Sequence, residues 1–164
     1  RNQAQLASVR DPLTGALNRA GLDQVYAANL HSWMNPGQSN ALIMVDLDHF
    51  KIVNDTHGHS VGDQVLIQFC KLMRKRLRRT DLLARWGGEE FVIVCPGATA
   101  VLARQIAEHL RQAMQREAWP AGLEVTASFG VAIMRAEGGL VGAFEVADRA
   151  LYEAKRAGRN RVMF

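Results

Sequence analysis

Hydrophobic and polar positions follow two different periods along the chain, and these periods predict strands and helices in alternation. A nearly continuous apolar run from Ala41 to Leu47 is typical of a strand that is buried on both faces. From Asp63 onward, apolar residues recur at helical spacing and predict an amphipathic helix with a basic outer face. The same patterns predict helices at 18–33, 48–54, 99–117 and 142–157, and strands at 82–86, 90–95, 125–134 and 161–164.

The segments between these elements carry turn signals. Asp11 to Gly15 reads as a turn because Asp precedes Pro and a glycine follows. Thr56 to Gly62 reads as a Gly-rich loop, and Gly87-Gly88 reads as the turn of a hairpin. Together the elements predict an α/β (α+β) fold, in which helices pack on a mixed sheet.

The length of 164 residues suits one domain with a proper core. We expect this domain over residues 10–164. Gln3 to Val9 resembles the end of a helix that arrives from upstream, so residues 1–9 are interpreted as the end of a linker helix. Because the chain does not begin with Met, we expect it to be part of a longer protein.

Composition excludes several classes of protein. Apolar residues make up 48% of the chain and charged residues 22%, which argues against disorder and against a coiled coil. No apolar stretch approaches the roughly 18 residues of a membrane span. Cys70 and Cys95 are too few for a disulfide framework or a zinc site, and we expect core thiols in a reducing compartment. A net charge of +4 weakly favours an anionic partner such as a nucleotide.

Acidic residues fall at the ends of two predicted strands. Asp46 lies at the end of the first buried strand, and Glu89 and Glu90 lie at the hairpin turn. If these strands are neighbours, three carboxylates meet, and their repulsion favours a hard divalent cation such as Mg²⁺. The alternative is a solvated hairpin tip whose acidic residues keep the edge of the sheet soluble.

Four motifs carry a resemblance to a known family. "RWGGEEF" at 85–91 resembles the GGDEF domain of diguanylate cyclases, in the variant with Glu at the third position. "DPLTGALNR" at 11–19 is similar to the family's entry motif, and "DLDHFKIVNDTHGHSVGDQVL" at 46–66 to its nucleotide-binding block. "ALYEAKRAGRNRV" at 150–162 is similar to its C-terminal phosphate-contacting block. The resemblance spans residues 10–164, with the motifs in the family's order.

The resemblance implies a fold and a reaction. The implied fold is a central, mostly antiparallel sheet flanked by helices, similar to nucleotidyl cyclases and polymerase palms. The implied reaction condenses two GTP into cyclic di-GMP and two pyrophosphates, between two domains that face each other as a homodimer. It further implies a cytoplasmic domain under an upstream regulatory domain, without direct membrane contact; membrane attachment of the parent protein stays open. A nucleic-acid-binding module that uses the basic face from Lys71 to Arg79 is disfavoured, because that face lacks the interleaved aromatic residues on which bases stack. The alternative is a receptor that binds cyclic di-GMP or GTP without turnover.

By the resemblance, the acidic residues hold Mg²⁺ or Mn²⁺, two ions per GTP. Asp46 and Glu89 are the implied metal ligands, together with the backbone carbonyl of Leu47. Glu90 either completes this set or accepts the proton of the 3′-hydroxyl, so Glu89 and Glu90 are the implied catalytic residues. Gly87 and Gly88 are expected to let the backbone approach phosphate closely.

Residues after the first strand are expected to bind the triphosphate. Asp48 is interpreted as the N-cap of the short helix. Backbone N–H groups near His49 and Phe50, at the start of that helix, suit phosphate, and Lys51 can add a positive charge. Phe50 is also expected in the core.

Asn54 and Asp63 match the family's guanine-contacting pair. A carboxylate such as Asp63 can accept hydrogen bonds from both guanine N1–H and N2–H, which adenine lacks. Asp63 also stands where a helix N-cap belongs. His57 and His59 could suggest zinc, but with no third ligand evident, an ordering role in the loop is favoured.

Two groups of basic residues complete the implied sites. Lys155 and Arg159 are implied to reach the β- and γ-phosphates; the alternative is that they only complement the dipole at a helix C-terminus. Arg78 and Asp81 form an R-x-x-D motif at the position of the family's inhibitory site for cyclic di-GMP, and Arg111 is a further candidate there. A solvated basic face is the alternative for this segment.

Overall fold

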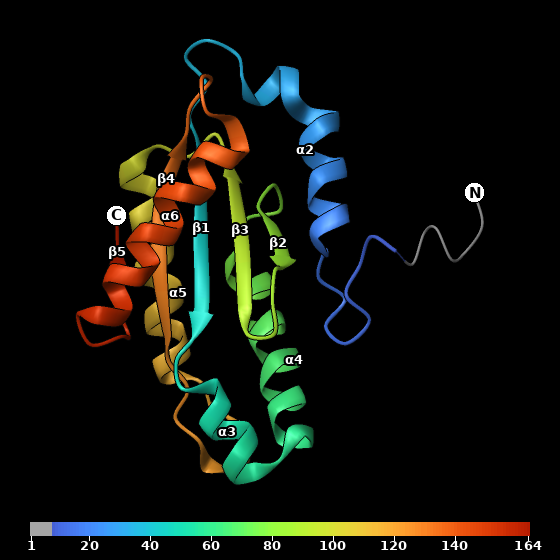
Figure 1. Cartoon of the computed structure of the whole chain (residues 1–164), viewed down its shortest axis with the longest axis vertical. Coiled ribbons are helices and arrows are strands. Elements are labelled where there is room, and N and C mark those ends of the chain that lie inside the picture. The colour runs from blue at the N-terminus through green and yellow to red at the C-terminus, as the bar shows by residue number, and fades with distance from the viewer. Residues whose placement is uncertain (1–7) are drawn as a thin grey trace.

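The computed structural model describes residues 8–164 and centres on a five-stranded sheet with strand order β2-β3-β1-β4-β5 (Figure 1). β1 (Asn40–Leu47) lies in the middle and pairs antiparallel with β3 (Glu90–Pro96) and with β4 (Ala127–Met134). The edge strand β2 (Leu82–Arg85) pairs antiparallel with β3, and the short β5 (Val162–Met163) pairs parallel with β4. The predicted mixed, mostly antiparallel sheet is confirmed.

Helices cover both faces of the sheet. α2 (Arg19–Trp33) and α6 (Gly139–Arg156) lie on the front face in Figure 1, while α4 (His59–Arg76) and α5 (Ala100–Arg116) lie behind. The short helix α3 (Phe50–His57) extends from the lower end of β1, and a 3₁₀ turn, η1 (Pro120–Gly122), follows α5.

The apolar run of β1 is continuous because both faces of the strand are covered. Ile43 and Val45 pack in the cluster under α4 and α5, while Leu42 and Met44 pack in the cluster under α2 and α6. Successive side chains of a strand point to opposite faces, so a strand between two helical layers needs apolar residues at every position.

The contact between α6 and β4 depends on Gly130. A Cβ atom at Gly130 would lie 2.1 Å from the carbonyl oxygen of Ala147 and 2.5 Å from the backbone nitrogen of Leu151. Any larger side chain would therefore push the helix away from the sheet. This close approach fixes the position of α6, whose last turn carries Lys155.

Several predicted element boundaries are confirmed. Asn18 caps α2 and accepts a hydrogen bond from Gly21 N, and Thr99 caps α5 by accepting one from Leu102 N. Asp11 forms the predicted turn, accepting hydrogen bonds from the backbone N–H and the hydroxyl of Thr14.

Cys70 and Cys95 are buried free thiols, as expected, and burial raises the pKa of Cys70 to about 11.

The prediction of a loop at Thr56 to Gly62 is wrong. α3 continues to His57 and α4 begins at His59, with only Gly58 between them at φ 86°. Asp63 therefore lies inside the first turns of α4 and is not its N-cap. A single residue with positive φ suffices for the change of direction, because glycine adopts that conformation without a steric penalty.

The prediction that Asp48 caps the short helix is also wrong. The N-cap position of α3 is taken by His49, in a left-handed conformation with φ 56° and with no side-chain hydrogen bond to the helix. The Asp48 carboxylate is turned into the protein, where its partners are Thr126 just before β4, Ser128 in β4 and Asn160 in the C-terminal loop.

Most of the helix predicted at Gln3 to Val9 lies outside the described residues; Ser8 and Val9 lie in a turn. Within residues 8–164, no helix is long and apolar enough to cross a membrane.

Candidate functional site

The acidic residues predicted to act together lie at one end of the central strands. Asp46 of β1 stands opposite Glu90 of β3 in the antiparallel register. The backbone N–H of Leu47 donates a hydrogen bond of 3.1 Å to the carbonyl oxygen of Glu89. The sheet therefore brings Asp46, Leu47, Glu89 and Glu90 to the same edge.

Asp46 is the buried acidic residue of this group, with 8% of its surface exposed. Burial raises the pKa of its carboxyl group to about 6, the contact with Lys155 works against this shift, and the charges of Glu89 and Glu90 add to it. Lys155 Nζ, from the last turn of α6, lies 2.6 Å from Asp46 Oδ2. The ammonium group thus supplies the positive charge that this buried carboxylate requires.

The chemistry of these groups fits a hard divalent cation. Carboxylate and carbonyl oxygens are the ligands that Mg²⁺ and Mn²⁺ prefer, and Mg²⁺ commonly takes one or two carboxylates together with substrate phosphates. Within residues 8–164, no three His, Cys, Asp or Glu side chains are already arranged to hold an ion. A cation bound at Asp46 would therefore compete with Lys155 for the carboxylate, and it would need the glutamates or a ligand for its remaining positions.

Hydrogen bonds from neighbouring residues fix the Gly87-Gly88 turn. The backbone N–H groups of Trp86 and Gly87 both donate to the carbonyl oxygen of Glu90, at 2.8 and 3.1 Å. The Arg85 guanidinium donates to the carbonyl oxygens of Gly87 and Gly88, at 3.3 and 2.8 Å. These bonds hold the backbone next to Glu89 and Glu90.

Arg85 is itself oriented by Asp11, a contact that the sequence analysis missed. Its Nη1 lies 3.2 Å from both carboxylate oxygens of Asp11. Burial alone would raise the pKa of Asp11, but hydrogen bonds from Thr14 and Arg85 hold it below its ordinary value. Asp11 and Arg85 lie in two of the motifs that resemble the family, at 11–19 and 85–91, but the motifs do not predict a contact between these two residues.

The start of α3 presents backbone N–H groups beside β1. The first N–H groups of a helix have no partner within the helix, and His49 does not cap them with its side chain. Phe50 is buried, as predicted. Lys51 is exposed and pairs with Asp55 at 2.9 Å, which raises its pKa.

Asn54 lies against the first turns of α4, because α3 and α4 are joined by the single residue Gly58. Asn54 packs against Gly62, the neighbour of Asp63: a Cβ atom at Gly62 would lie 1.9 Å from Asn54 Oδ1. Asp63 is exposed. His57 and His59 flank the joint and are also exposed.

The segment after α6 carries Arg159. Its backbone is left-handed, with φ 65°, and its N–H donates to the carbonyl oxygen of Ala154 at 2.9 Å. The next residue, Asn160, is also left-handed and donates its N–H to Asp48 Oδ2 at 3.0 Å. The structure thus places Lys155 at Asp46 and Arg159 in a loop attached to Asp48.

The R-x-x-D pair lies at the opposite end of β3. The Arg78 guanidinium donates to both carboxylate oxygens of Asp81, with a shortest distance of 2.7 Å, and to the carbonyl oxygen of Pro96 at 3.1 Å. A cavity of about 320 Å³ beside this pair is lined by basic side chains that include Arg10, Arg74 and Arg79. Its position separates it from the acidic edge.

Arg111 does not contact this pair. It binds Glu108 through two hydrogen bonds of 2.7 and 2.8 Å, and it donates to Asn160 Oδ1 at 3.0 Å and to Gln115 Oε1 at 3.1 Å. Within one chain, Arg111 therefore contacts the C-terminal loop through Asn160.

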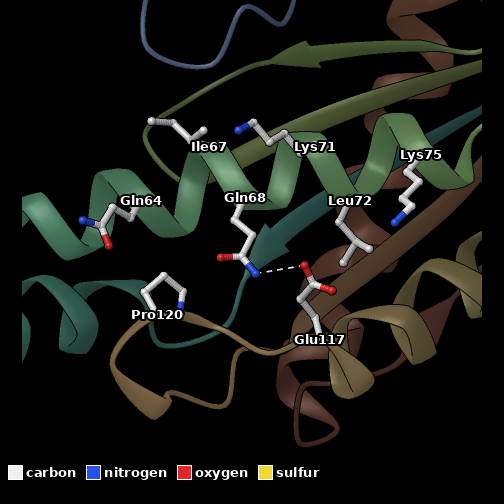
Figure 2. A pocket seen from close by; sticks show the side chains of 8 residues that line it. All are labelled: Gln64, Ile67, Gln68, Lys71, Leu72, Lys75, Glu117 and Pro120. Carbon is white, nitrogen blue, oxygen red and sulfur yellow. Dashed lines mark hydrogen bonds between the residues drawn. The ribbon is translucent and has the colours of Figure 1, made fainter.

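Cavities also lie away from the predicted residues. Figure 2 shows one of about 470 Å³ between α4 and the segment that contains Glu117 and Pro120. Gln68 crosses it and donates to Glu117 Oε2 at 2.9 Å and to the carbonyl oxygen of Ala118 at 2.8 Å. None of its lining residues is a predicted site residue. By contrast, Gly87 and Gly88 line an open cavity of about 500 Å³ next to the acidic edge.

A family model, curated relatives and solved structures all relate this chain to diguanylate cyclases and their GGDEF domains. Residues 8–161 match the family described as diguanylate cyclase, GGDEF domain. The chain is 41% identical over 160 residues to the diguanylate cyclase DgcP of Pseudomonas aeruginosa, which covers 94% of this chain and 24% of DgcP. The chain thus spans about a quarter of that relative.

Two solved structures are similar over almost the whole chain. One is the diguanylate cyclase SiaD of Pseudomonas aeruginosa in complex with its activator SiaC, with a TM-score of 0.90 and 40% identity over 98% of this chain and 63% of that one. The other is the coiled coil and GGDEF domain of DgcB from Caulobacter crescentus in complex with c-di-GMP, with a TM-score of 0.89 and 29% identity over 98% and 87%.

Proposed function

Since the chain belongs to the GGDEF family of diguanylate cyclase domains, we propose that it joins two GTP molecules into cyclic di-GMP. In this reaction the 3′-oxygen of each GTP forms a bond to the α-phosphorus of the other, and each α–β phosphoanhydride bond breaks to release pyrophosphate. Each domain binds one GTP, so the reaction takes place between two copies that face each other. The observation that carries this proposal is the register of Asp46 opposite Glu90 at one end of the sheet.

The acidic edge holds Mg²⁺ or Mn²⁺, two ions per GTP, through Asp46, Glu89, Glu90 and the carbonyl oxygen of Leu47. A bound ion polarises the phosphoryl oxygens and lowers the pKa of the attacking hydroxyl group. Glu90 binds an ion or accepts the proton of the 3′-hydroxyl. The fixed backbone of Gly87 and Gly88 lets the reacting phosphate come close to the turn.

The remaining residues bind and orient the nucleotide. N–H groups near His49 and Phe50 bind the triphosphate at the start of α3, and Lys51 adds a positive charge. Lys155 exchanges Asp46 for phosphate oxygens when GTP and metal arrive. Together with Arg159, it stabilises the negative charge that develops on the departing pyrophosphate.

Asn54 and Asp63 select guanine. The Asp63 carboxylate accepts the two donors that guanine presents at N1 and N2. ATP offers no such pair and would leave polar groups without partners, at a cost of about 1–3 kcal/mol each. The packing of Asn54 against Gly62 supports this assignment, since it holds the amide at the residue that precedes Asp63.

Product binds at the second site and inhibits the enzyme. Arg78 suits a planar, two-bonded contact with guanine or phosphate, while Asp81 suits guanine N–H groups. Arg111 reaches this site only from a second chain, because within its own chain it is bound near Asn160. We place the domain in the cytoplasm, downstream of a regulatory domain that controls how two copies meet.

Product analysis tests the proposal. Purified protein at high concentration, incubated with GTP and Mg²⁺, is expected to form cyclic di-GMP and two pyrophosphates, identified by chromatography. Glu90→Gln is expected to form none, while Glu153→Gln, on the exposed side of α6, retains activity. The alternative function, a receptor without turnover, predicts nucleotide binding but no product from a dimer forced by a fused coiled coil.

A further inference from the structure

The loop after α6 has an uncommon backbone conformation. Arg159 and Asn160 are consecutive residues with φ of 65° and 46°, and neither is glycine. L-residues with side chains adopt the left-handed region rarely, and such residues persist only where the surroundings hold them. The contacts that hold this loop therefore also decide where Arg159 can reach.

The first of these contacts is made by Asp48. Its carboxylate is buried, with 7% of the residue exposed, and accepts three hydrogen bonds. Oδ2 accepts from the backbone N–H of Asn160 at 3.0 Å and from the Thr126 hydroxyl at 2.7 Å, and Oδ1 accepts from the Ser128 hydroxyl at 2.7 Å. Asp48 thus joins the loop to the end of β1 and to β4.

A second contact holds the loop from the side of α5. The Asn160 side chain accepts a hydrogen bond of 3.0 Å from Arg111 Nη1. Arg111 is itself fixed by Glu108, through bonds of 2.7 and 2.8 Å. Asn160 is therefore bound through its backbone on one side and through its side chain on the other.

Arg159 has a fixed backbone and an available side chain. Its N–H donates to Ala154, and its carbonyl oxygen accepts from Arg161 Nε at 3.0 Å. Over residues 8–164, its guanidinium group has no hydrogen-bond or ion-pair partner. The Arg159 guanidinium group is thus available to bind a ligand, four residues after Lys155.

We propose that Asp48 is a positioning residue: by holding Asn160, it orients Arg159 toward the triphosphate. The inference rests on the proposed function for the identity of the ligand. It gives Asp48 a role different from that of Asp46, although the two are separated by one residue. Asp46 faces the proposed cation site, while the Asp48 carboxylate accepts hydrogen bonds from three donors of the protein.

This role predicts which substitutions Asp48 tolerates. In Asp48→Asn, the amide oxygen can take the place of Oδ2 and accept from Asn160, while the new NH₂ group faces Ser128, whose hydroxyl can rotate to accept. Asp48→Ala removes every bond to the loop. An electrostatic or metal-binding role would instead be lost in both variants.

A double-mutant cycle tests the inference by calorimetric binding of a GTP analogue with a non-cleavable α–β linkage, in the presence of Mg²⁺. Asp48→Ala is expected to raise the dissociation constant about tenfold, Asp48→Asn less than threefold, and the exposed control Asp148→Ala not at all. In an Arg159→Ala background, Asp48→Ala is expected to add less than twofold, since its effect passes through Arg159. An equal effect in both backgrounds, or equal loss in Asp48→Asn and Asp48→Ala, would overturn the inference.

A second variant and a second readout separate this inference from the proposed function. Asn160→Gly keeps the left-handed backbone but removes the bond to Arg111, and it is expected to raise the dissociation constant about threefold only when Arg159 is present. Hydrogen exchange at the Asn160 amide should be slow in the wild type and much faster in Asp48→Ala. If the protein binds the analogue but makes no cyclic di-GMP, the proposed function fails while the cycle stands. If the Asn160 amide exchanges equally fast in both proteins, the inference fails whatever the activity.

Discussion

Lys155 Nζ lies 2.6 Å from Asp46 Oδ2, so the last turn of α6 neutralises a buried carboxylate at the end of the central strand. The two residues are 109 positions apart in the chain. In the proposed reaction, this ion pair exists before substrate binds. When GTP and its metal ion bind, Asp46 contacts the metal ion and Lys155 contacts phosphate oxygens instead. The contact therefore predicts how metal, nucleotide and pH affect the protein.

Asp46→Asn should stabilise the metal-free protein at neutral pH. The pKa of Asp46 is about 6 in the folded protein and 3.8 as its ordinary value, so the folded state holds a proton that the unfolded state releases. The Asp46 contribution to stability therefore falls as pH rises from about 4 to about 6. We expect Asp46→Asn to be more stable than the wild type by about 1–3 kcal/mol at pH 7.5 and nearly equal at pH 3.5.

Urea unfolding in the presence of a chelator measures this difference. Asp148→Asn, at an exposed position of α6, should show no such pH dependence. The same stability difference between wild type and Asp46→Asn at both pH values would contradict the account of Asp46.

Lys155→Met should have opposite effects on metal and on GTP. Without nucleotide, Mn²⁺ should bind several-fold more tightly, because the ammonium group no longer competes for Asp46. With GTP, the KM should rise about tenfold, or ~1.4 kcal/mol, because a phosphate contact is lost. Mn²⁺ titration followed by electron paramagnetic resonance checks the first effect, and steady-state kinetics the second. Lys71→Met, on the exposed face of α4, serves as the control; weaker metal binding in Lys155→Met would be inconsistent with competition.

Gly62→Ala should weaken GTP binding although alanine favours helices. The new Cβ atom would lie 1.9 Å from Asn54 Oδ1, so the Asn54 amide must move. We expect the KM for GTP to rise about tenfold, with less discrimination against ATP. Gly142→Ala is the matched control: its Cβ meets nothing within 4 Å, and the substitution should stabilise α6 by about 0.5–1 kcal/mol. Unchanged kinetics in Gly62→Ala would remove Asn54 from the guanine site.

Arg78→Ala should abolish product inhibition and leave the initial rate within about twofold. The substitution removes both the guanidinium group and the two-bonded contact that orients Asp81. Initial rates measured with added cyclic di-GMP check this expectation. Arg76→Ala, at an exposed position of α4 outside the cavity beside Arg78, should remain inhibited within about threefold. Inhibition that persists in Arg78→Ala would exclude the R-x-x-D site.

The sequence predicted the sheet and the acidic edge because both depend on local signals. Asp46 lies next to the end of the apolar run of β1, and the Gly87-Gly88 turn precedes Glu89, so the positions of these acidic residues follow from strand ends. Their register across β1 and β3 confirms that prediction.

The roles of Asp48 and Lys155 could not be predicted in the same way. An aspartate just before a short helix has the propensity of an N-cap, but three donors 78, 80 and 112 residues away bind Asp48 instead. The ion pair of Lys155 with Asp46 likewise depends on how closely α6 approaches β4, which Gly130 decides. Only the packed structure contains that information.

The prediction of a loop between α3 and α4 was wrong for a different reason. Gly58 and Gly62 both count against a helix in a local reading, so the segment resembled a loop. In the structure, Gly58 makes the turn alone, while Gly62 lies inside α4 because Asn54 occupies the space of a Cβ atom. Gly62 is therefore explained by its close contact with Asn54 and does not interrupt the helix.

A crystal structure with Mn²⁺ and a non-cleavable GTP analogue tests the central claim most directly, since anomalous scattering locates the ion. The account predicts Mn²⁺ within about 2.5 Å of oxygen atoms of Asp46 and Glu89, with Lys155 Nζ moved from Asp46 to a phosphate oxygen. Mn²⁺ bound only to the nucleotide, with the pair of Lys155 and Asp46 intact, would contradict it.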